Sequence, residues 1–474
     1  MKPVAVIGGG ITGLTAAFRL RQRNIPVTLY EASERVGGVI QSVRRDGYLA
    51  EYGPNTMMET SPKVAALIKD LGLTARRIDS DPAAKNRYLV RDARPIKLPE
   101  SPLQFVTTPL FSTAAKLRLL REPFIAPGDP AREESVAEFV YRRLGPEFLD
   151  RAIDALVGGI YAGDPRRLSV PQAFPKLHAL EQKYGSLLKG QIMGARERRR
   201  RDEVAKPHAK MFSFDEGLQV LPDSLRARLA DDIRLQAPVM KMTQKEQGWS
   251  LMSPSDESGR EHSAVIYAAS AGGLARMNIA TRRPIDVASL AEINYPPVAS
   301  VVLGFRRKDI AHPLDGFGML IPRIEGFRIL GTIFSSSLFP NRAPAGCATL
   351  TSYVGGARSP GLAQKSADEL FQITLEDLRV LLGIKGEPTF RHQVVFPKAI
   401  PQYNLGYARF KQLMSTAEAN APGLFFGGHY RDGISVSDCI VSGHDVAERV
   451  AKYLRDLPGK TEPQTTNLHA EVAA

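Results

Sequence analysis

The sequence lacks several features on which common classes of protein depend. It has only two cysteines, Cys347 and Cys439, so we expect no disulfide framework and favour a reducing compartment. No apolar run approaches the roughly 18 residues that a membrane-spanning helix needs. The eight histidines show no spacing typical of metal ligands, and no catalytic triad or internal repeat is apparent. We therefore expect no metal centre.

No targeting segment is expected either, because the first apolar strand pattern begins at about residue 3. This favours a cytoplasmic protein, or one that binds a membrane only peripherally. The 63 basic residues outnumber the 50 acidic ones, and the net charge of +13 favours acidic partners. The densest basic cluster is Arg196 with residues 198–201. No nucleic-acid motif accompanies it, so a solvated loop and a face toward anionic lipid both remain open.

The strongest pattern in the chain is at its start. Residues 4–7 form a short apolar run typical of a buried parallel strand, and residues 27–30 form a second. Between them lie a glycine-rich turn and an apolar helical stripe, and Glu31 ends the second strand. The turn consists of Gly8, Gly9, Gly10, Ile11, Thr12 and Gly13. Strand, glycine turn, helix, strand and acid together predict a dinucleotide-binding unit.

Each residue type in this unit has a physical reason. Gly8 permits the tight turn, Gly10 lets a pyrophosphate approach the backbone, and Gly13 lets helix and strand pack closely. The helix N-terminus then offers free N–H groups and a partial positive charge to the phosphates. Glu31 can accept hydrogen bonds from a ribose diol and disfavours a 2′-phosphate, so NADP is not expected.

Two later segments change the expected cofactor from NAD to FAD. Glu31 is followed by Arg35-Val36-Gly37-Gly38-Val39, and a second turn contains Gly53-Pro54-Asn55-Thr56. This arrangement resembles the flavoprotein amine-oxidase superfamily, in which both segments run along FAD. The resemblance also implies that Val239 contacts the adenine through its backbone and that a helix start near Ile434, Ser435 and Val436 stabilises the reduced flavin. His429 stands where related sequences more often carry a small residue; it either contacts the flavin or is a satisfied polar group.

Further segments narrow the resemblance to the protoporphyrinogen oxidase family of haem synthesis. They occur in collinear order, and the match covers nearly everything except about the last fifteen residues. The segments are Asn86-Arg87-Tyr88, residues 158–164, residues 315–322, residues 400–406 and residues 433–440.

This resemblance implies a function, which we weigh against several alternative functions. The expected reaction is FAD-dependent oxidation of protoporphyrinogen IX to protoporphyrin IX, in which O2 takes six electrons as three H2O2. Coproporphyrinogen III is the alternative substrate. An amine oxidase would be expected to carry a flavin-linked lysine and an aromatic cage, neither of which is identified. A polyene desaturase would lack the segment at residues 159–164, and a porphyrin or flavin carrier would produce no substrate-dependent peroxide.

The resemblance also implies the substrate residues. Arg87 is expected to pair with a propionate through a planar two-pronged contact. Gly159 is expected beside the reacting ring carbon, where it accepts a proton or leaves room, and Gly159 and Arg87 are the catalytic candidates. The positions expected to sandwich the macrocycle are Phe317, Leu320, Ile333 and Tyr353.

We predict an α/β fold with a Rossmann-like FAD-binding domain built from discontinuous segments, a mixed-sheet substrate domain and a helical membrane-associated insertion. The FAD-binding segments are 1–85, 206–285 and 405–457. The substrate segments are 86–95 and 286–404, the insertion is 96–205, and residues 458–474 are a polar tail predicted to be disordered.

The insertion at residues 96–205 is predicted to consist of short helices separated by Pro and Gly. In the resembled family this region carries a peripheral membrane contact, and an ordinary helical subdomain is the alternative. The candidate apolar groups are Phe105, Val106, Leu110 and Phe111. A homodimer and contacts with other haem-pathway enzymes are expectations at the level of the family only.

Overall fold

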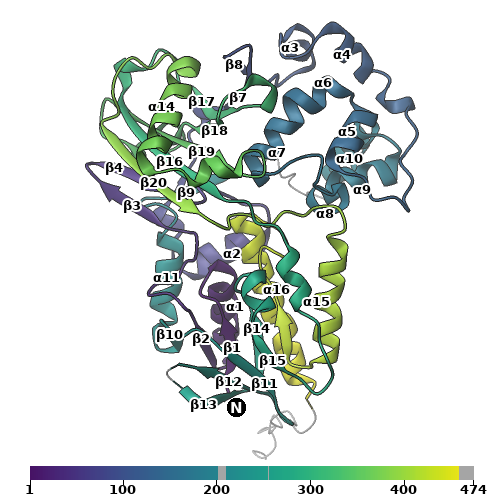
Figure 1. The fold of residues 1–474 in the computed structure, drawn as a ribbon, viewed down its shortest axis with the longest axis vertical. Helices are drawn as coiled ribbons and strands as arrows, with labels where there is room; N and C mark the ends of the chain where they lie inside the picture. Colours follow the sequence, from purple (N-terminus) through teal and green to yellow (C-terminus); the bar gives the residue numbers. More distant parts are fainter. Residues whose placement is uncertain (201–209, 255, 458–474) are drawn as a thin grey trace, which may run out of the picture.

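The computed structural model describes residues 1–200, 210–254 and 256–457. Figure 1 shows a lower lobe around a parallel sheet and an upper part with a mixed sheet on the left and a bundle of helices on the right. The predicted tail at residues 458–474 lies outside the described residues, and so do Arg201 and the side chains of the other arginines of the basic cluster. The backbone of Arg196 and of residues 198–200 belongs to α10 (Leu187–Arg200) rather than to a loop.

The lower lobe collects strands from the whole length of the chain. In the described residues, its parallel sheet has the order β10-β2-β1-β14-β21, with β1 (Val4–Ile7) at the centre. These strands are mostly apolar because both faces of the sheet are covered. The helices at residues 11–21 and 436–455 pack on one face, and residues 242–251 pack on the other together with the helix at residues 408–420. A strand near residue 265 pairs with the first strand, and a strand at residues 424–426 pairs with that one, so the predicted discontinuous segments share one sheet. The other strands are β2 (Val27–Tyr30), β10 (Ile233–Arg234), β14 (Ala264–Tyr267) and β21 (Leu424–Phe426).

Two helices pack together against this sheet. A Cβ atom at Gly443 of α16 (Val436–Arg455) would lie 2.5 Å from the carbonyl oxygen of Thr12 in α1 (Ile11–Arg21), so only glycine permits this approach. The N-termini of the two helices therefore lie at the same end of the lobe. The other helices around the lobe are α2 (Pro62–Asp70), α11 (Val220–Arg228), α12 (Ala271–Ala275) and α15 (Ala408–Asn420).

Smaller sheets complete the lower lobe and join it to the upper part. Residues 241–253 form a hairpin in which β11 is antiparallel to β12. The bounds are β11 (Lys241–Gln244), β12 (Trp249–Ser253), β13 (Asp256–His262), β15 (Asn278–Ala280), β3 (Ser42–Arg45), β4 (Tyr48–Glu51), β5 (Met57–Met58), β6 (Arg77–Asp79) and β9 (Met211–Phe214).

The mixed sheet of the upper part separates two environments. Among the described residues, its order is β20-β16-β19-β18-β17-β7-β8. Successive side chains of a strand point to opposite faces, so Tyr88 and Met319 pack under α14 (Ala367–Leu382) while Leu89 and Leu320 face the helical bundle. The strands are β7 (Asn86–Arg91), β8 (Arg94–Lys97), β16 (Val298–Arg306), β17 (Gly316–Leu320), β18 (Ile329–Ile333), β19 (Cys347–Gly355) and β20 (Phe390–Phe396), and α13 (Ser335–Leu338) follows β18.

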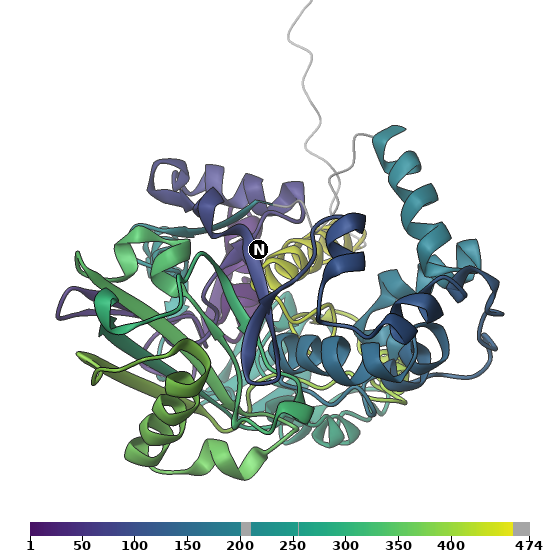
Figure 2. The same ribbon diagram turned by 90° about the horizontal axis from the view of Figure 1, so that it is seen from above.

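The insertion at residues 96–205 contains short helices, as the sequence predicts. Residues 146–161 form a short α6, then a π-helical turn at Leu149–Ile153 and then α7 (Asp154–Tyr161). Figure 2 shows α10 projecting from the bundle. The other helices are α3 (Pro102–Thr107), α4 (Thr113–Leu119), α5 (Val136–Arg143), α6 (Pro146–Phe148), α8 (Val170–Ala173) and α9 (Pro175–Tyr184).

Two of the proposed membrane-facing residues are misassigned. Leu110 is fully buried and Phe111 nearly so, because Phe111 stacks on Phe148 with ring centroids 4.2 Å apart. They form the core of the insertion and cannot reach a lipid surface. Within the described ranges, no helix combines the length and apolar character needed to cross a bilayer.

Candidate active site

The glycine turn at the start of α1 has the geometry that a dinucleotide needs. Gly8 has φ +106°, which L side chains rarely adopt. A Cβ atom at Gly13 would lie 1.9 Å from the Gly8 carbonyl oxygen, so helix and strand are in close contact there. A Cβ atom at Gly10 would meet no protein atom within 4 Å. The space in front of Gly10, at the N-cap of α1, is therefore open and fits the pyrophosphate of FAD.

Glu31 is held in place beside this turn. Its Oε2 accepts a hydrogen bond from the Gly9 amide at 2.6 Å, and its Oε1 accepts from the amide and hydroxyl of Ser33, each at 2.8 Å. The chain before Val239 runs alongside, because the amide of Ala237 donates to the Glu31 carbonyl at 2.9 Å. Glu31 and Val239 thus lie at the same end of the site, as their predicted contacts to ribose and adenine require.

The predicted segments at residues 35–39 and 53–56 touch each other over the turn. The guanidinium of Arg35 donates to the carbonyls of Val36, Gly38 and Ile40 and so fixes the loop between them. A Cβ atom at Gly38 would lie 3.5 Å from Gly10 Cα, and one at Gly53 would lie 2.6 Å from the Val39 carbonyl oxygen. Pro54 and Thr56 are half-buried beside them.

Tyr353 joins this cofactor segment to the mixed sheet. Its hydroxyl donates to the Gly53 carbonyl at 3.1 Å and accepts from Asn55 Nδ2 at 2.7 Å. Burial raises the pKa of the Tyr353 phenol well above its usual range, so the hydroxyl stays protonated. Residues from the two lobes therefore meet through a fixed hydrogen-bonded contact.

The last predicted cofactor residues surround the start of α16. A Cβ atom at Gly428 would lie 3.7 Å from Thr12 Oγ1, which brings the turn after β21 to the N-terminus of α1. Ser435 is the N-cap of α16 and accepts from the Asp438 amide at 3.0 Å, with Ile434 before it and Val436 after it.

His429 lies among aromatic rings. Its ring meets the edges of Tyr295 and Tyr430 at centroid distances of 5.8 and 6.0 Å. Burial lowers the pKa of the imidazole to about 4, so it is neutral near pH 7. These contacts favour the interpretation of His429 as a packed polar group.

The substrate candidates gather on the face of the mixed sheet that looks toward α7. Leu320 of β17 lies opposite Gly331, which lies opposite Tyr353, so the two side chains share one face. Arg87, Gly318 and Ile333 form the next row of cross-strand neighbours. A Cβ atom at Gly159 of α7 would lie 2.4 Å from Leu320 Cδ2, so helix and sheet touch at this glycine. Phe317 packs in the same small cluster as Ile333.

Arg87 differs from its neighbours in having an exposed side chain that no acid neutralises. Within the described residues, no carboxylate lies within ion-pair distance of its guanidinium. Asn86 and Tyr88 on either side both bond to Asp315 instead. Although partial burial opposes it, hydrogen bonds from Lys97 and Tyr88 lower the pKa of Asp315 to about 2. Strand β7 is thus anchored on one face while Arg87 remains available on the other.

Sequence reasoning missed the ionic contact beneath α7. The buried carboxylate of Asp154 accepts from the Arg323 amide at 2.7 Å and from Arg358 Nη2 at 2.9 Å. Arg358 Nη1 also donates to the Ile321 carbonyl at 2.9 Å. These bonds fix α7 against the end of β17, and hence Gly159 against Leu320. No local signal could reveal the pair, since its members are 204 residues apart.

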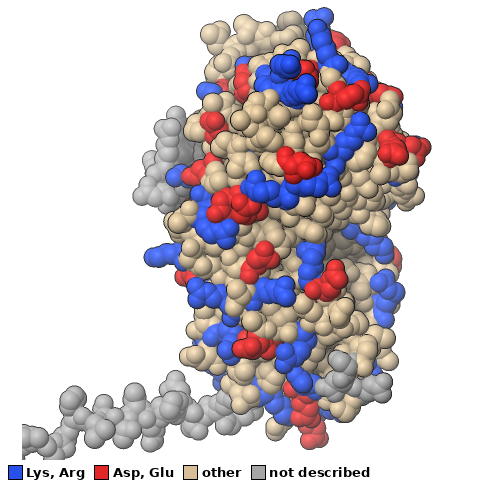
Figure 3. Space-filling view, turned by 90° about the vertical axis from the view of Figure 1, so that its left-hand side faces the viewer, with Lys and Arg blue, Asp and Glu red and all other residues tan. Residues whose placement is uncertain are grey.

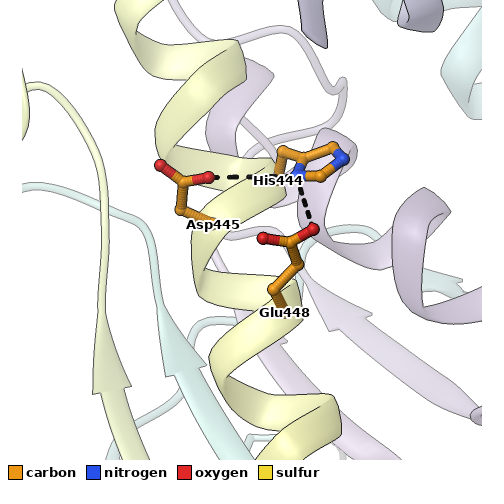
Figure 4. A group of neighbouring side chains, drawn as sticks. All are labelled: His444, Asp445 and Glu448. Atoms are coloured by element: carbon orange, nitrogen blue, oxygen red, sulfur yellow. Dashed lines mark ion pairs between the residues drawn. The ribbon is translucent and has the colours of Figure 1, made fainter.

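One cluster on α16 has ligand atoms close enough to hold a metal. Figure 4 shows His444 between Asp445 and Glu448, with Nδ1 3.9 and 3.5 Å from their carboxylate oxygens. Lys63 pairs with both acids, and Arg23 pairs with Glu448 at 3.4 Å. The acids are thus already neutralised by bases, which is the arrangement of a surface ion network.

Comparisons with known proteins agree with this geometry. The family model described as flavin containing amine oxidoreductase matches residues 11–451. Protoporphyrinogen oxidase 2, chloroplastic/mitochondrial, of Arabidopsis thaliana is 37% identical over 98% of this chain and 96% of its own length. Coproporphyrinogen III oxidase of Bacillus subtilis (strain 168) is 31% identical over 96% and 98%, respectively.

A solved structure shows the same fold. The crystal structure of "Putative protoporphyrinogen oxidase" from Exiguobacterium sp. 255-15 superposes with a TM-score of 0.79 at 23% identity, over 96% of this chain and 99% of the other. Together with the open space at Gly10 and the position of Glu31, these matches identify FAD as the cofactor. The chain therefore belongs to the flavin-containing amine oxidoreductase family, in the branch that contains protoporphyrinogen oxidases and coproporphyrinogen III oxidases.

Proposed function

We propose that this protein oxidises protoporphyrinogen IX to protoporphyrin IX, with FAD as cofactor and O2 as the final acceptor. The macrocycle loses six electrons and six hydrogens, and three O2 become three H2O2. Bound FAD supplies the hydride-accepting chemistry. The protein's own residues bind the propionates, orient the ring and exclude water. Relatives at 35–37% identity with this name support the proposal.

The unpaired guanidinium of Arg87 is the observation that carries the choice of substrate. It can bind a propionate through two parallel N–H···O bonds. Arg151, Arg323 and Arg358, which also lie next to α7, are each engaged with a carboxylate. Among the described residues around the proposed substrate face, Arg87 is the guanidinium without an acidic partner. One such guanidinium suits a substrate with two propionates better than one with four, because each additional carboxylate placed against the protein needs its own cationic partner.

The remaining candidates suit a flat ring. Leu320, Ile333 and Phe317 offer an apolar wall on the mixed sheet, and Gly159 faces that wall from α7. We assign Gly159 the role of leaving room for the reacting edge of the macrocycle. A side chain at this position would displace Leu320 from the wall.

Coproporphyrinogen III is the second candidate. It is favoured by relatives of that name from Bacillus subtilis and Staphylococcus aureus, at 31% identity. The net charge of +13 could serve the extra carboxylates only if it gathered near the site. Figure 3 shows acidic and basic residues interspersed over one side of the molecule, so the surplus is not concentrated on that face.

Porphyrin fluorescence decides between the candidates. The purified, FAD-loaded protein is given each porphyrinogen in parallel in air, with autoxidation subtracted and peroxide counted. Faster porphyrin formation from protoporphyrinogen, with three peroxides per porphyrin, is the expected result. Preference for coproporphyrinogen would reassign the substrate. No enzyme-dependent signal from either would leave an amine oxidase, a desaturase or a carrier.

We further propose that the insertion makes a peripheral contact with an anionic membrane surface. Large apolar side chains of α3, α4 and the following turn are exposed, with Phe124 86%, Leu103 75% and Leu120 67% accessible. Arg121 lies in the same stretch, is exposed and can meet anionic headgroups. Co-sedimentation with phosphatidylglycerol vesicles should weaken in Phe124→Ser with Leu120→Ser, and equal binding by the double variant would refute the contact. The expected homodimer remains a prediction.

A further inference from the structure

The segment at residues 400–406 matches the family but has no role in the proposed chemistry. It lies between the helical insertion and the cofactor lobe, where Gln402 and Tyr403 are only 1% and 2% exposed. The Ser169 amide donates to the Tyr403 carbonyl at 2.9 Å, which ties the segment to the insertion. Its side chains therefore contact both parts of the molecule that form the site.

The hydroxyl of Tyr403 bridges the two ends of the turn that precedes α16. It donates to the carbonyl of His429 at 2.5 Å and accepts from the amide of Gly433 at 3.0 Å. Gly433 has φ +127°, a conformation that other residues rarely adopt. Both hydrogen-bonding capacities of the phenol are thus used to hold residues 429 and 433 at a fixed separation.

That turn sets where the N-terminus of α16 points. The helix is 20 residues long, and its first amides carry a partial positive charge. Downstream, α16 is fixed by its close approach to α1 at Gly443. Upstream, residues 432–436 are exposed or half-buried, so few core contacts hold them. The other hydrogen bonds of this stretch come from Gly428, from Ser442 and from the capping box of α16. Tyr403 is the residue that ties the stretch to the segment at residues 400–406.

Gln402, the residue next to Tyr403, contacts the end of α7, the helix that carries Gly159. Gln402 Nε2 donates to the carbonyl of Tyr161 at 2.8 Å, at the last residue of α7. A Cβ atom at Gly163 would lie 2.6 Å from Gln402 Oε1, so the chain after α7 packs on this amide. Two consecutive residues therefore contact the end of the helix that carries Gly159 and the turn before α16.

We propose that Tyr403 is a positioning residue for the flavin. Its hydroxyl holds the turn at residues 429–433 so that the N-terminus of α16 faces the bound flavin. Gln402 fixes the position of α7 relative to this turn. The inference rests on the proposed placement of the flavin against residues 433–436. It predicts that the properties of bound FAD depend on a phenol that does not itself contact FAD.

Tyr403→Phe tests this, with Tyr407→Phe as a matched control. Tyr407 is equally buried, packs on Tyr403 with centroids 4.4 Å apart, and donates to the Tyr430 carbonyl at 2.6 Å. Each variant removes one buried hydroxyl and leaves one carbonyl without its donor. Only Tyr403→Phe also removes the acceptor of the Gly433 amide.

Three readouts need no porphyrinogen. In Tyr403→Phe we expect a more negative reduction potential of bound FAD by dye equilibration, since the reduced anion loses a fixed partner. We expect FAD to bind about tenfold more weakly, as the loss of one to two hydrogen bonds implies. Amide exchange at residues 429–436 should accelerate. Tyr407→Phe should leave the potential and that exchange unchanged. Equal shifts in both variants, or none in either, would overturn the proposal.

Val436→Asp separates this proposal from the placement on which it rests. An acid in the first turn of α16 should lower the FAD potential strongly if the flavin lies there. A lowered potential in Val436→Asp with an unchanged one in Tyr403→Phe would refute the role of Tyr403 alone. An unchanged potential in Val436→Asp would refute the placement itself. Neither result depends on which porphyrinogen is the substrate.

Discussion

Backbone groups form most of the cofactor end of the site, whereas side chains form most of the substrate end. At the cofactor end, the parts are backbone groups and the space left by absent side chains, as at Gly10, Gly38 and Gly53. At the substrate end, they are side chains from separate strands and one helix, as at Arg87, Leu320 and Gly159. At the cofactor end, a substitution of a single glycine is expected to block binding. At the substrate end, single substitutions can change the shape or charge of the wall without abolishing it.

The largest expected effect comes from filling the space at Gly10. Gly10→Val should abolish FAD retention, because the new side chain occupies the space that the pyrophosphate needs. It should leave the fold intact, since a Cβ atom there meets no protein atom within 4 Å. The ratio of flavin to protein absorbance and a thermal melt measure the two effects. Gly361→Val, at another open glycine far from the turn, is the control. A yellow, FAD-replete Gly10→Val would contradict the cofactor site.

Gly159→Ala should produce the next largest effect and leave FAD bound. The added methyl displaces Leu320 into the space proposed for the ring, and we expect kcat/KM to fall about a hundredfold. Leu320→Ala removes the displaced atoms. The double variant should therefore recover part of the loss, and a purely additive double variant would argue against this contact. Steady-state kinetics with protoporphyrinogen provide the measurement.

Arg87→Ala should raise KM about tenfold to a hundredfold and change kcat less, because a propionate contact is made equally in ground and transition states. Arg87→Lys should be intermediate, since it keeps the charge and loses the two-pronged geometry. Lys85→Ala removes a nearby exposed base that lies 3.8 Å from Glu100 and should change neither constant. An unchanged KM for both porphyrinogens in Arg87→Ala would remove Arg87 from the site.

The smallest effect at neutral pH concerns His429. Its folded pKa of about 4 lies below the unfolded value of about 6.5, so its neutral form stabilises the fold above pH 6.5 and that contribution is lost as pH falls toward 4. At pH 4.5 the loss is about 2–3 kcal/mol. His429→Asn should therefore flatten the decline of Tm between pH 7 and 4.5. Parallel declines in both proteins would show that this imidazole does not control acid stability.

The same contrast explains what the sequence could predict. The glycine turn, Glu31 and their flanking strands are contiguous, so hydrophobic period and glycine spacing suffice to predict them. A mixed-sheet substrate domain is predicted as a class only, whereas its strand order and the packing of α14 on one face are seen only in the structure. Leu110 and Phe111 are misassigned because an apolar pair that follows a proline gives the same sequence pattern whether it packs inward or faces outward. Tyr403 and Asp154 act through partners distant in sequence, so no local pattern predicts the residues that they contact.

The order of strands in the parallel sheet has a consequence for biosynthesis. Its central strand is residues 4–7, but an edge strand is residues 424–426, and the helix proposed to face the flavin comes later still. The sheet cannot be completed until almost all of this sequence has left the ribosome. Pairings between such distant segments form slowly, since long loops must close first. We therefore expect FAD to bind after translation. We also expect the apolar strands that are synthesised first to need protection from aggregation until the later strands pair with them.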